Sequence, residues 1–199
     1  MRKIKKLILV MALLYFALSK YNPQDIGNIS IPEIPVIETL PSYEEGEKEA
    51  PTLTECELLK VVDGDTLTVL FNGEKAKVRL IGIDTPESVH SDAGKNTEIG
   101  NIASDYTKAL LSDTKYVYLE FDEDMYDTFD RLLAYVYIDE AVTSARQSLN
   151  YHLANEGYAK NKEYPPNVKY AALFKDAFED AKEKSKGLWI YEETKTIWQ

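Results

Sequence analysis

The sequence predicts an α+β fold in which five β-strands form a barrel and three helices are inserted between the strands or follow them. Three strand-like segments, residues 57–62, 65–71 and 75–83, are separated only by an Asp-Gly and an Asn-Gly turn, which is a strong short-range signal for β-hairpins. Two more apolar segments, 116–121 and 131–138, follow after a stretch with helical periodicity. Five antiparallel strands with helices inserted and appended fit an OB-fold barrel.

Each of the three expected helices has apolar residues at helical spacing or a recognisable end. The first covers residues 97–111. The second covers residues 145–155, with Thr143 as a candidate N-cap and Gly157 as its stop. The third and longest covers residues 167–186, opens after two prolines and closes at a glycine.

The N-terminal quarter differs from the rest of the chain. Four basic residues precede an apolar run that is too short to span a bilayer comfortably, so residues 1–19 are expected to be a secretory signal peptide or an uncleaved membrane anchor. Residues 20–52 are rich in proline and glutamate and are expected to be a disordered linker. The folded domain is expected to cover residues 53–191, followed by a C-terminal tail at 192–199.

Charged residues gather at the ends of the predicted barrel strands. The apolar strand that contains Arg79 ends abruptly at Asp84, after which Thr85, a proline and Glu87 follow. The upstream Asp-Gly turn would place Asp65 at the start of the neighbouring strand. Carboxylates at rigid strand ends, with an arginine on the same strand, suit metal and phosphate chemistry. A solvated polar turn is the alternative interpretation of this pattern.

Three motifs taken together resemble the thermonuclease (staphylococcal nuclease-like) family. They are the Asp-Gly-Asp-Thr hairpin at residues 63–66, the strand and turn at 79–87, and the Arg-Leu-Leu-Ala-Tyr-Val-Tyr strand at 131–137. They occur in the family's order and at similar spacing, and the resemblance covers residues 53–189. Any one of these motifs is a weak signal, whereas the three in order are a strong one.

The resemblance implies the same OB-fold and a calcium-dependent nuclease activity. It places Ca²⁺ between Asp65 and Asp84, with the carbonyl of Thr85 as a third ligand. These are hard oxygen donors of the kind that calcium binds. The resemblance also makes Glu87 the candidate general base, which orients or deprotonates the attacking water.

Arg79 and Arg131 match the two arginines that bind the scissile phosphate in the family. A guanidinium group is always charged and binds two phosphate oxygens through parallel hydrogen bonds, which lysine cannot reproduce. For Arg131, a surface ion pair with Asp127 or Asp130 is the alternative role.

The chain departs from the family pattern where substrate would be held. Residues 128–130 read Thr-Phe-Asp where the family has Lys-Tyr-Gly, so the lysine and the tyrosine hydroxyl that would contact a terminal phosphate are missing. Tyr164 matches one of the two tyrosines of the nucleotide pocket, and Lys162 occupies the position of the other. Lys160 and Lys169 are expected to help near this pocket.

Composition narrows the functional classes. The chain carries 23 Lys and Arg against 34 Asp and Glu, a net charge of −11, so nucleic-acid binding must depend on a local positive site. The single cysteine, Cys56, excludes an intramolecular disulfide and any multi-cysteine zinc site. His90 and His152 are isolated and are expected to be exposed and structural, respectively.

The sequence therefore predicts a monomeric, calcium-dependent nuclease that is secreted or tethered to the cell surface. It is expected to cleave DNA and RNA with low sequence specificity and, by resemblance, to leave 3′-phosphate ends. No protein partner is evident, and membrane contact is expected only through an uncleaved N-terminal segment. A non-catalytic OB-fold module that binds nucleic acid and a structural protein of the cell surface are the alternatives.

Overall fold

The computed structural model describes residues 51–88 and 97–198. The expected leader at 1–19, almost all of the expected linker at 20–52, and His90 lie outside the described residues. Within the described ranges, no helix has both the length and the apolar character needed to cross a membrane.

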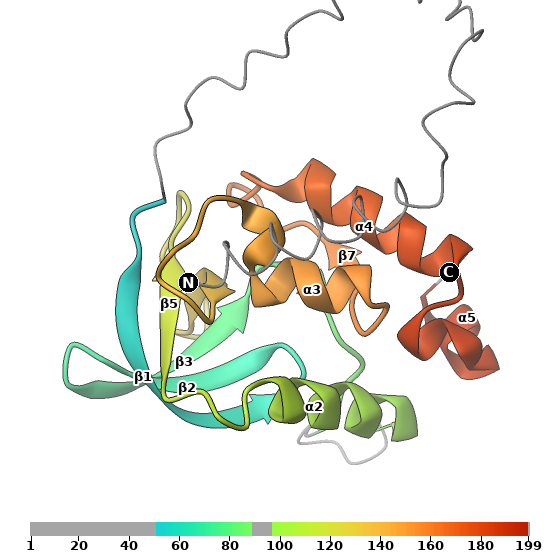
Figure 1. The fold of residues 1–199 in the computed structure, drawn as a ribbon, viewed down its shortest axis with the longest axis horizontal. Helices are drawn as coiled ribbons and strands as arrows, with labels where there is room; N and C mark the ends of the chain where they lie inside the picture. The colour runs from blue at the N-terminus through green and yellow to red at the C-terminus, as the bar shows by residue number, and fades with distance from the viewer. Residues whose placement is uncertain (1–50, 89–96, 199) are drawn as a thin grey trace, which may run out of the picture. The chain divides into compact units, whose positions relative to one another are not determined.

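Five strands in the described part of the chain close into a barrel in the order β1-β2-β3-β6-β5 (Figure 1). The strands are β1 Thr54–Asp63, β2 Thr66–Phe71, β3 Glu74–Leu80, β5 Tyr116–Glu120 and β6 Leu132–Tyr137. The antiparallel meander β1-β2-β3 forms as predicted, and its second turn has positive φ at both Asn72 and Gly73. The OB-fold barrel that the sequence predicts is thus confirmed.

The closure of the barrel differs from the prediction of five antiparallel strands. β3 and β6 run parallel, with Val78 opposite Leu132 and Arg79 opposite Leu133. β6 can run parallel to β3 because a helix and β5 intervene along the chain and bring β6 in from the same end of the barrel. The prediction of an all-antiparallel sheet is therefore wrong at this one pair.

The two faces of β6 are both buried, which defines where a functional site can lie. Leu132, Ala134 and Val136 belong to the barrel's interior cluster, together with Val78 and Leu80 of β3. The alternating residues Leu133, Tyr135 and Tyr137 pack outside the barrel in a second cluster, which also includes the ring of Phe174 from the helix at residues 171–183. Arg79 alternates with the interior residues of β3 and pairs with Leu133, so it lies on the outer wall of the barrel.

The predicted strand 75–83 is broken after Leu80. Gly82 has φ +83°, a backbone conformation that L side chains rarely adopt, and a Cβ atom there would collide with the ring of Phe174. The chain therefore leaves the barrel and forms a short strand, β4 Gly82–Asp84, which pairs with β7 Lys160–Lys162 in a separate two-stranded sheet.

The buried side chain of Asn150 seals the point where the chain leaves β3. Its amide nitrogen donates to the carbonyl oxygens of Ile81 (2.8 Å) and Ala134 (3.1 Å), and its oxygen accepts from the backbone N–H of Val136 (2.9 Å). Asn150 thus provides hydrogen-bond partners for buried backbone groups at the break in the strand ladder, and the carbonyl of Ala134 also accepts from the N–H of Ile81 at 3.2 Å.

We expect Asn150→Ala to lower the free energy of unfolding by about 2–4 kcal/mol, because buried backbone groups left unpaired each cost about 1–3 kcal/mol. Urea unfolding followed by tryptophan fluorescence measures the change. Asn101→Ala, at an exposed position on the helix that follows β4, is the matched control and should have little effect.

The structure also corrects the second and third predicted helices. Residues 145–155 form a 3₁₀ turn, Ala145–Gln147, and then α3 Leu149–Asn155, with Ser144 and Ser148 as the N-caps instead of Thr143. The third helix, α4, begins only at Ala171 and runs to Glu183. It starts late because the side chain of Asn167, instead of capping a helix, pairs with both backbone groups of Asp124 at 2.7 and 2.9 Å.

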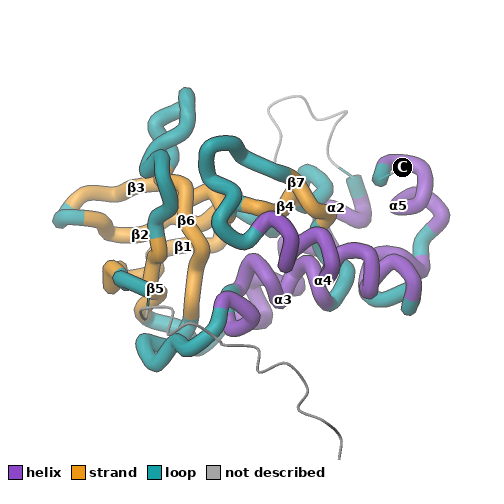
Figure 2. Tube along the Cα trace, turned by 90° about the horizontal axis from the view of Figure 1, so that it is seen from above, coloured by secondary structure: helices purple, strands orange, loops and turns teal. Residues whose placement is uncertain are grey.

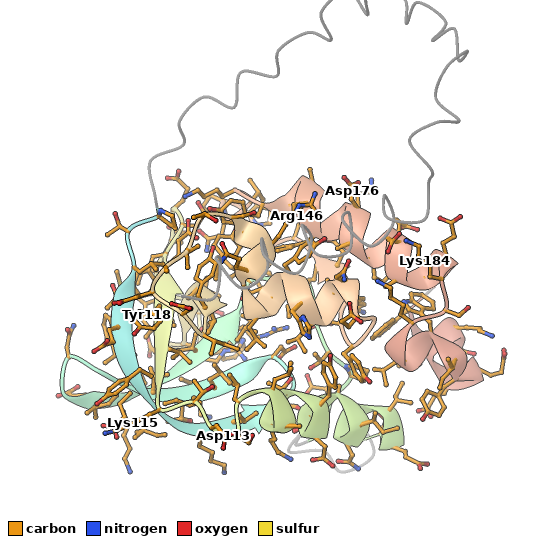
Figure 3. All side chains as sticks on the ribbon, viewed as in Figure 1. Asp113, Lys115, Tyr118, Arg146, Asp176 and Lys184 are labelled. Carbon is orange, nitrogen blue, oxygen red and sulfur yellow. The ribbon has the colours of Figure 1, made fainter. Side chains whose placement is uncertain are left out.

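Within the described ranges there are four α-helices, one more than predicted. α2 Glu98–Leu110 contacts β1, and α3 and α4 pack side by side next to the barrel (Figure 2). The exposed side chain of Asp176 lies on α4, and that of Lys184 lies just beyond its C-terminal end (Figure 3). The additional helix, α5 Glu192–Ile197, occupies the segment expected to be a tail. It is anchored by Trp198, whose ring packs edge-on against Trp189 at 5.3 Å between centroids.

Candidate active site

Two carboxylates from separate segments share one guanidinium group on the outer wall of the barrel. The Nη1 atom of Arg79 lies 2.9 Å from Oδ2 of Asp65, and its Nη2 atom donates to Oδ1 of Asp84 at 2.6 Å. The side chain of Arg79 is only 5% exposed, so this is a buried ion-pair network. The structure therefore brings together Asp65, Arg79 and Asp84, three of the site residues that the sequence predicts.

Backbone contacts between the two turns fix this arrangement. The N–H of Leu80 donates to the carbonyl of Asp65 (3.0 Å), and the N–H of Thr85 donates to the Asp65 carboxylate (2.8 Å). Gly64 allows this approach, because a Cβ atom there would lie 2.8 Å from Oγ1 of Thr85. Position 64 therefore needs glycine, because the side chain of any other residue would collide with Thr85 in the turn after β4.

The backbone around Glu87 is held from two sides. The next residue, Ser88, donates its hydroxyl to Asp63 at 2.6 Å and its N–H to the same carboxylate at 3.2 Å. On the other side, the carbonyl of Glu87 accepts from the N–H of Thr97, the N-cap of α2 (3.0 Å), and a Cβ atom at Gly100 would collide with that carbonyl. The exposed Glu87 carboxylate is thus presented from an anchored turn.

The sequence identified Glu87 but missed its anchors. In the sequence, Asp63 is part of the predicted Asp-Gly turn, and no pattern marks Ser88 as its partner. The two residues are 25 positions apart, and their contact forms only because the β1–β2 turn and the turn after β4 meet in space. The Asp-Gly-Asp spacing was the one available signal, because it places a second acid beside Asp65.

Lysines on β7 complete the charge distribution around Asp84. β7 pairs with β4 so that Asp84 faces Lys160, and Nζ of Lys162 lies 3.0 Å from Oδ1 of Asp84, whereas Nζ of Lys160 lies 3.6 Å from Oδ2. The ring of Tyr164 lies beside the same cations, 5.5 Å from the Arg79 guanidinium and 5.4 Å from Lys162. Tyr164 and Lys162 therefore lie at this cluster, and their role in a nucleotide pocket stays a prediction.

Two other expected contributors are held elsewhere. Lys169 lies 2.7 Å from the buried carboxylate of Glu120, so its ammonium group neutralises that acid instead of extending the cationic cluster. Arg131 immediately precedes β6, the strand that pairs with β3, and its guanidinium binds Asp127 through Nε and Nη2, both at 2.7 Å. The alternative ion pair with Asp127 is thus present.

Burial and charge shift the pKa values of the central residues. Burial raises the pKa of Asp65, and the neighbouring carboxylates of Asp84 and Asp63 raise it further against the opposing effect of Arg79. Burial alone would lower the pKa of Arg79, but the negative charges around it, including Asp65 and Glu87, outweigh burial and raise it. Glu87 is therefore close enough to act electrostatically on Arg79.

The donor set fits a hard divalent cation. Within the described ranges, no three acidic, histidine or cysteine side chains are grouped closely enough to hold a metal ion. Two carboxylates, of Asp65 and Asp84, meet at the guanidinium of Arg79, and the backbone of Thr85 is held at Asp65 through its N–H, so the carbonyl of Thr85 belongs to the same turn. All of these are oxygen donors of the kind that calcium binds. A bound cation would have to compete with Lys162 and Arg79 for Asp84.

A closed OB-fold barrel carries two carboxylates on one buried arginine, with an exposed glutamate three residues beyond the second carboxylate, and this set of charges suits chemistry on phosphoryl groups. The family model of staphylococcal nuclease homologues matches residues 77–191. The chain is 39% identical over 133 residues to a thermonuclease of Staphylococcus intermedius, which covers 65% of this chain and 73% of the relative. It is 38% identical over 135 residues to a thermonuclease of Staphylococcus hyicus, with 66% and 73% covered. It is 35% identical over 144 residues to endonuclease YncB of Bacillus subtilis, with 71% and 64% covered.

The chain therefore belongs to the family of staphylococcal nuclease homologues, and it is a nuclease that hydrolyses phosphodiester bonds. The resemblance to the thermonuclease family that the sequence motifs indicated is confirmed.

Proposed function

We propose that this chain is a calcium-dependent nuclease that cleaves DNA and RNA with low sequence specificity and leaves 3′-phosphate ends. The observation that carries this proposal is the single guanidinium of Arg79 between Asp65 and Asp84, with Glu87 three residues beyond Asp84. The two aspartates would bind a metal cation, Arg79 would bind the substrate phosphate, and the carboxylate of Glu87 would act on the attacking water.

Asp65, Asp84 and the carbonyl of Thr85 would hold the calcium ion. When bound, the ion supplies charge neutralisation for a phosphate that becomes more negative in the transition state. Arg79 supplies a second positive charge from the protein itself, and its fork of N–H donors matches two phosphate oxygens. Arg131, which immediately precedes the strand paired with β3, would bind another oxygen of the same phosphate once substrate competes with Asp127.

Glu87 has the role of orienting or deprotonating the attacking water. Its carboxylate is exposed, so water and substrate can reach it, while its backbone is fixed by Ser88 and Thr97. A fixed backbone with an accessible carboxylate keeps the general base near one position, which lowers the entropic cost of reaching the reactive geometry.

The site of action is proposed from the N-terminal sequence alone. The basic residues and short apolar run before residue 19 indicate that the nuclease is exported or held at the cell surface, with residues 20–52 as a spacer. Its substrates there would be extracellular DNA and RNA.

Degradation of plasmid DNA with calcium, with a chelator, and by Glu87→Gln tests the proposal. Loss of cleavage on chelation and a large loss in the variant support the calcium-dependent enzyme. Binding without cleavage that is insensitive to calcium would indicate a non-catalytic OB-fold module. The absence of any interaction with nucleic acid would instead favour a structural role at the cell surface. Mapping the new ends with a 3′-phosphatase-dependent ligation tests the expected 3′-phosphate products.

The lysine at position 162 is expected to weaken calcium binding. Its ammonium lies 3.0 Å from Asp84 and is half exposed, so its removal should favour calcium by about 1 kcal/mol, or about five-fold in Kd. Titration calorimetry of Lys162→Ala without substrate measures this directly. Lys162→Arg should keep the wild-type affinity, and Lys184→Ala, whose ammonium pairs with Asp180 on α4, should not change it. Weaker calcium binding by Lys162→Ala would contradict the proposed ligand role of Asp84.

A further inference from the structure

The loop before β6 exposes an aromatic ring beside Arg131. Phe129 is 78% exposed, more than any other large hydrophobic residue in the described part of the chain. Tyr126 and Met125 on the same loop are 52% and 38% exposed. Singly exposed apolar residues are common on protein surfaces, but three on one loop next to a site arginine form a local apolar patch.

The ring of Phe129 is carried by an ordered turn. The carboxylate of Asp127 accepts hydrogen bonds from the backbone N–H groups of Phe129 (2.9 Å) and Arg131 (3.0 Å). The backbone N–H of Asp127 donates to the carbonyl of Arg131, and its carbonyl accepts from the N–H of Asp130. Asp130 takes φ +57°, which closes the turn tightly. Tyr126 forms an isolated bridge with Leu132, so both ends of the loop are joined to β6. The ring is thus held in solvent at a defined place.

The same turn orients Arg131 against the ring. The guanidinium carbon lies 5.6 Å from the Phe129 ring centroid, and Asp127 fixes the other side of the guanidinium through Nε and Nη2. A planar apolar face and a phosphate-binding cation therefore lie side by side. A nucleotide carries the complementary pair of groups, a planar base and a phosphate.

Charge around the loop indicates which part of a nucleotide the ring takes. Asp124, Asp127 and Asp130 all lie on this loop, and Phe129 has no hydroxyl that could donate to a phosphate oxygen. These acids disfavour a second phosphate group next to the ring, whereas a neutral base stacks on an aromatic face without electrostatic cost.

We propose that Phe129 is a stacking platform for an unpaired nucleobase of the strand being cut, next to the nucleotide whose phosphate lies on Arg131. This proposal rests on the proposed phosphate-binding role of Arg131. It makes Phe129 a specificity-determining residue, because a base within a duplex is already stacked and offers no free face. The enzyme should therefore prefer single-stranded over duplex substrate, and internal phosphodiesters over a terminal phosphate.

The test compares wild type, Phe129→Ala and Phe129→Trp on two single-stranded oligonucleotides. One oligonucleotide has a normal sequence with a single permitted cleavage position, flanked by phosphorothioate-blocked linkages, and the other has abasic residues on both sides of that position. On the normal strand, Phe129→Ala should raise KM about ten-fold, within the range that one base–aromatic stack contributes, with a small change in kcat. On the abasic strand the two proteins should have equal KM.

Phe129→Trp keeps the stacking face and should retain the wild-type KM. It also gives a second readout, since its tryptophan fluorescence should be quenched by the normal strand and unchanged by the abasic strand. Ile190→Ala, which removes a 63% exposed apolar side chain elsewhere, is the control and should leave KM unchanged. Thermal unfolding of each variant excludes a folding defect.

Equal KM for wild type and Phe129→Ala on the normal strand would overturn the stacking proposal. A ten-fold rise on both strands would also overturn it, because the loss would then not depend on a base. If the wild-type chain cleaves neither strand in calcium, the proposed function itself fails, which is a separate result from an active enzyme that is indifferent to Phe129.

Discussion

Glu87→Gln is expected to lower kcat for DNA cleavage by about 10²–10⁴-fold, the range that a positioned general base contributes. Glutamine keeps the size of the side chain but cannot accept a proton from water at neutral pH. Glu87 is exposed, and Ser88 and Thr97 hold the backbone around it, so the variant should keep the fold, which thermal unfolding checks. Steady-state kinetics on a fluorescent single-stranded substrate at saturating calcium measures the loss.

Glu183→Gln near the end of α4 is the matched control, because the same chemical change is made on an exposed glutamate away from the cluster. It should retain wild-type kcat. A Glu87→Gln variant with more than a tenth of the wild-type kcat would remove Glu87 from the chemical step and would leave water activation to another group.

Arg79→Met should have the largest effect on stability, with a loss of about 3–5 kcal/mol of unfolding free energy in calcium-free buffer. The guanidinium is buried between Asp65 and Asp84, and removal of one partner of a buried ion pair leaves the other charges uncompensated. Cleavage should fall below detection, because a phosphate-binding cation is lost as well. Urea unfolding and the kinetic assay used for Glu87 measure the two effects.

Two conditions should reduce the destabilisation of Arg79→Met. Calcium should restore part of the lost stability, since a cation between the two carboxylates substitutes for the guanidinium charge. Lower pH should act in the same direction: burial raises the pKa of Asp65, so the folded state binds this proton more tightly than the unfolded chain does, and protonation removes the need for a counter-charge as the pH falls. Arg146→Met, at an exposed arginine that contacts Tyr151, should be nearly neutral. Full stability of Arg79→Met without calcium would contradict the buried-network interpretation.

The local parts of the fold could be predicted because short-range signals determine them. The Asp-Gly and Asn-Gly turns specify the β1-β2-β3 meander through the backbone conformations that they allow, and the structure retains it. The pairing of β3 with β6 depends on how a chain segment of about fifty residues returns to the barrel, which no local pattern records. β4 and β7 have three residues each, too few for a periodic signal, and exist because Gly82 turns the chain out of the barrel.

The candidate site shows the same division. Asp65 and Arg79 could be predicted because the β2–β3 hairpin places them side by side, and Asp84 because it follows Arg79 closely along the chain. The lysine pair on β7 could be expected near a pocket, but its direct contact with Asp84 depends on the β4–β7 register. The contact of Asp63 with Ser88 and the packing of Gly100 on Glu87 were not predicted, since they join segments whose proximity is created by tertiary structure.

The most direct test of the account is a crystal structure with calcium and a phosphorothioate dinucleotide, with the ion located by its anomalous scattering. We predict an ion coordinated by the carboxylates of Asp65 and Asp84 and the carbonyl of Thr85, with Lys162 displaced from Asp84 and with Arg79 and Arg131 on the phosphate. An ion bound elsewhere, with Asp84 still paired to Lys162 and the phosphate distant from Glu87, would contradict it.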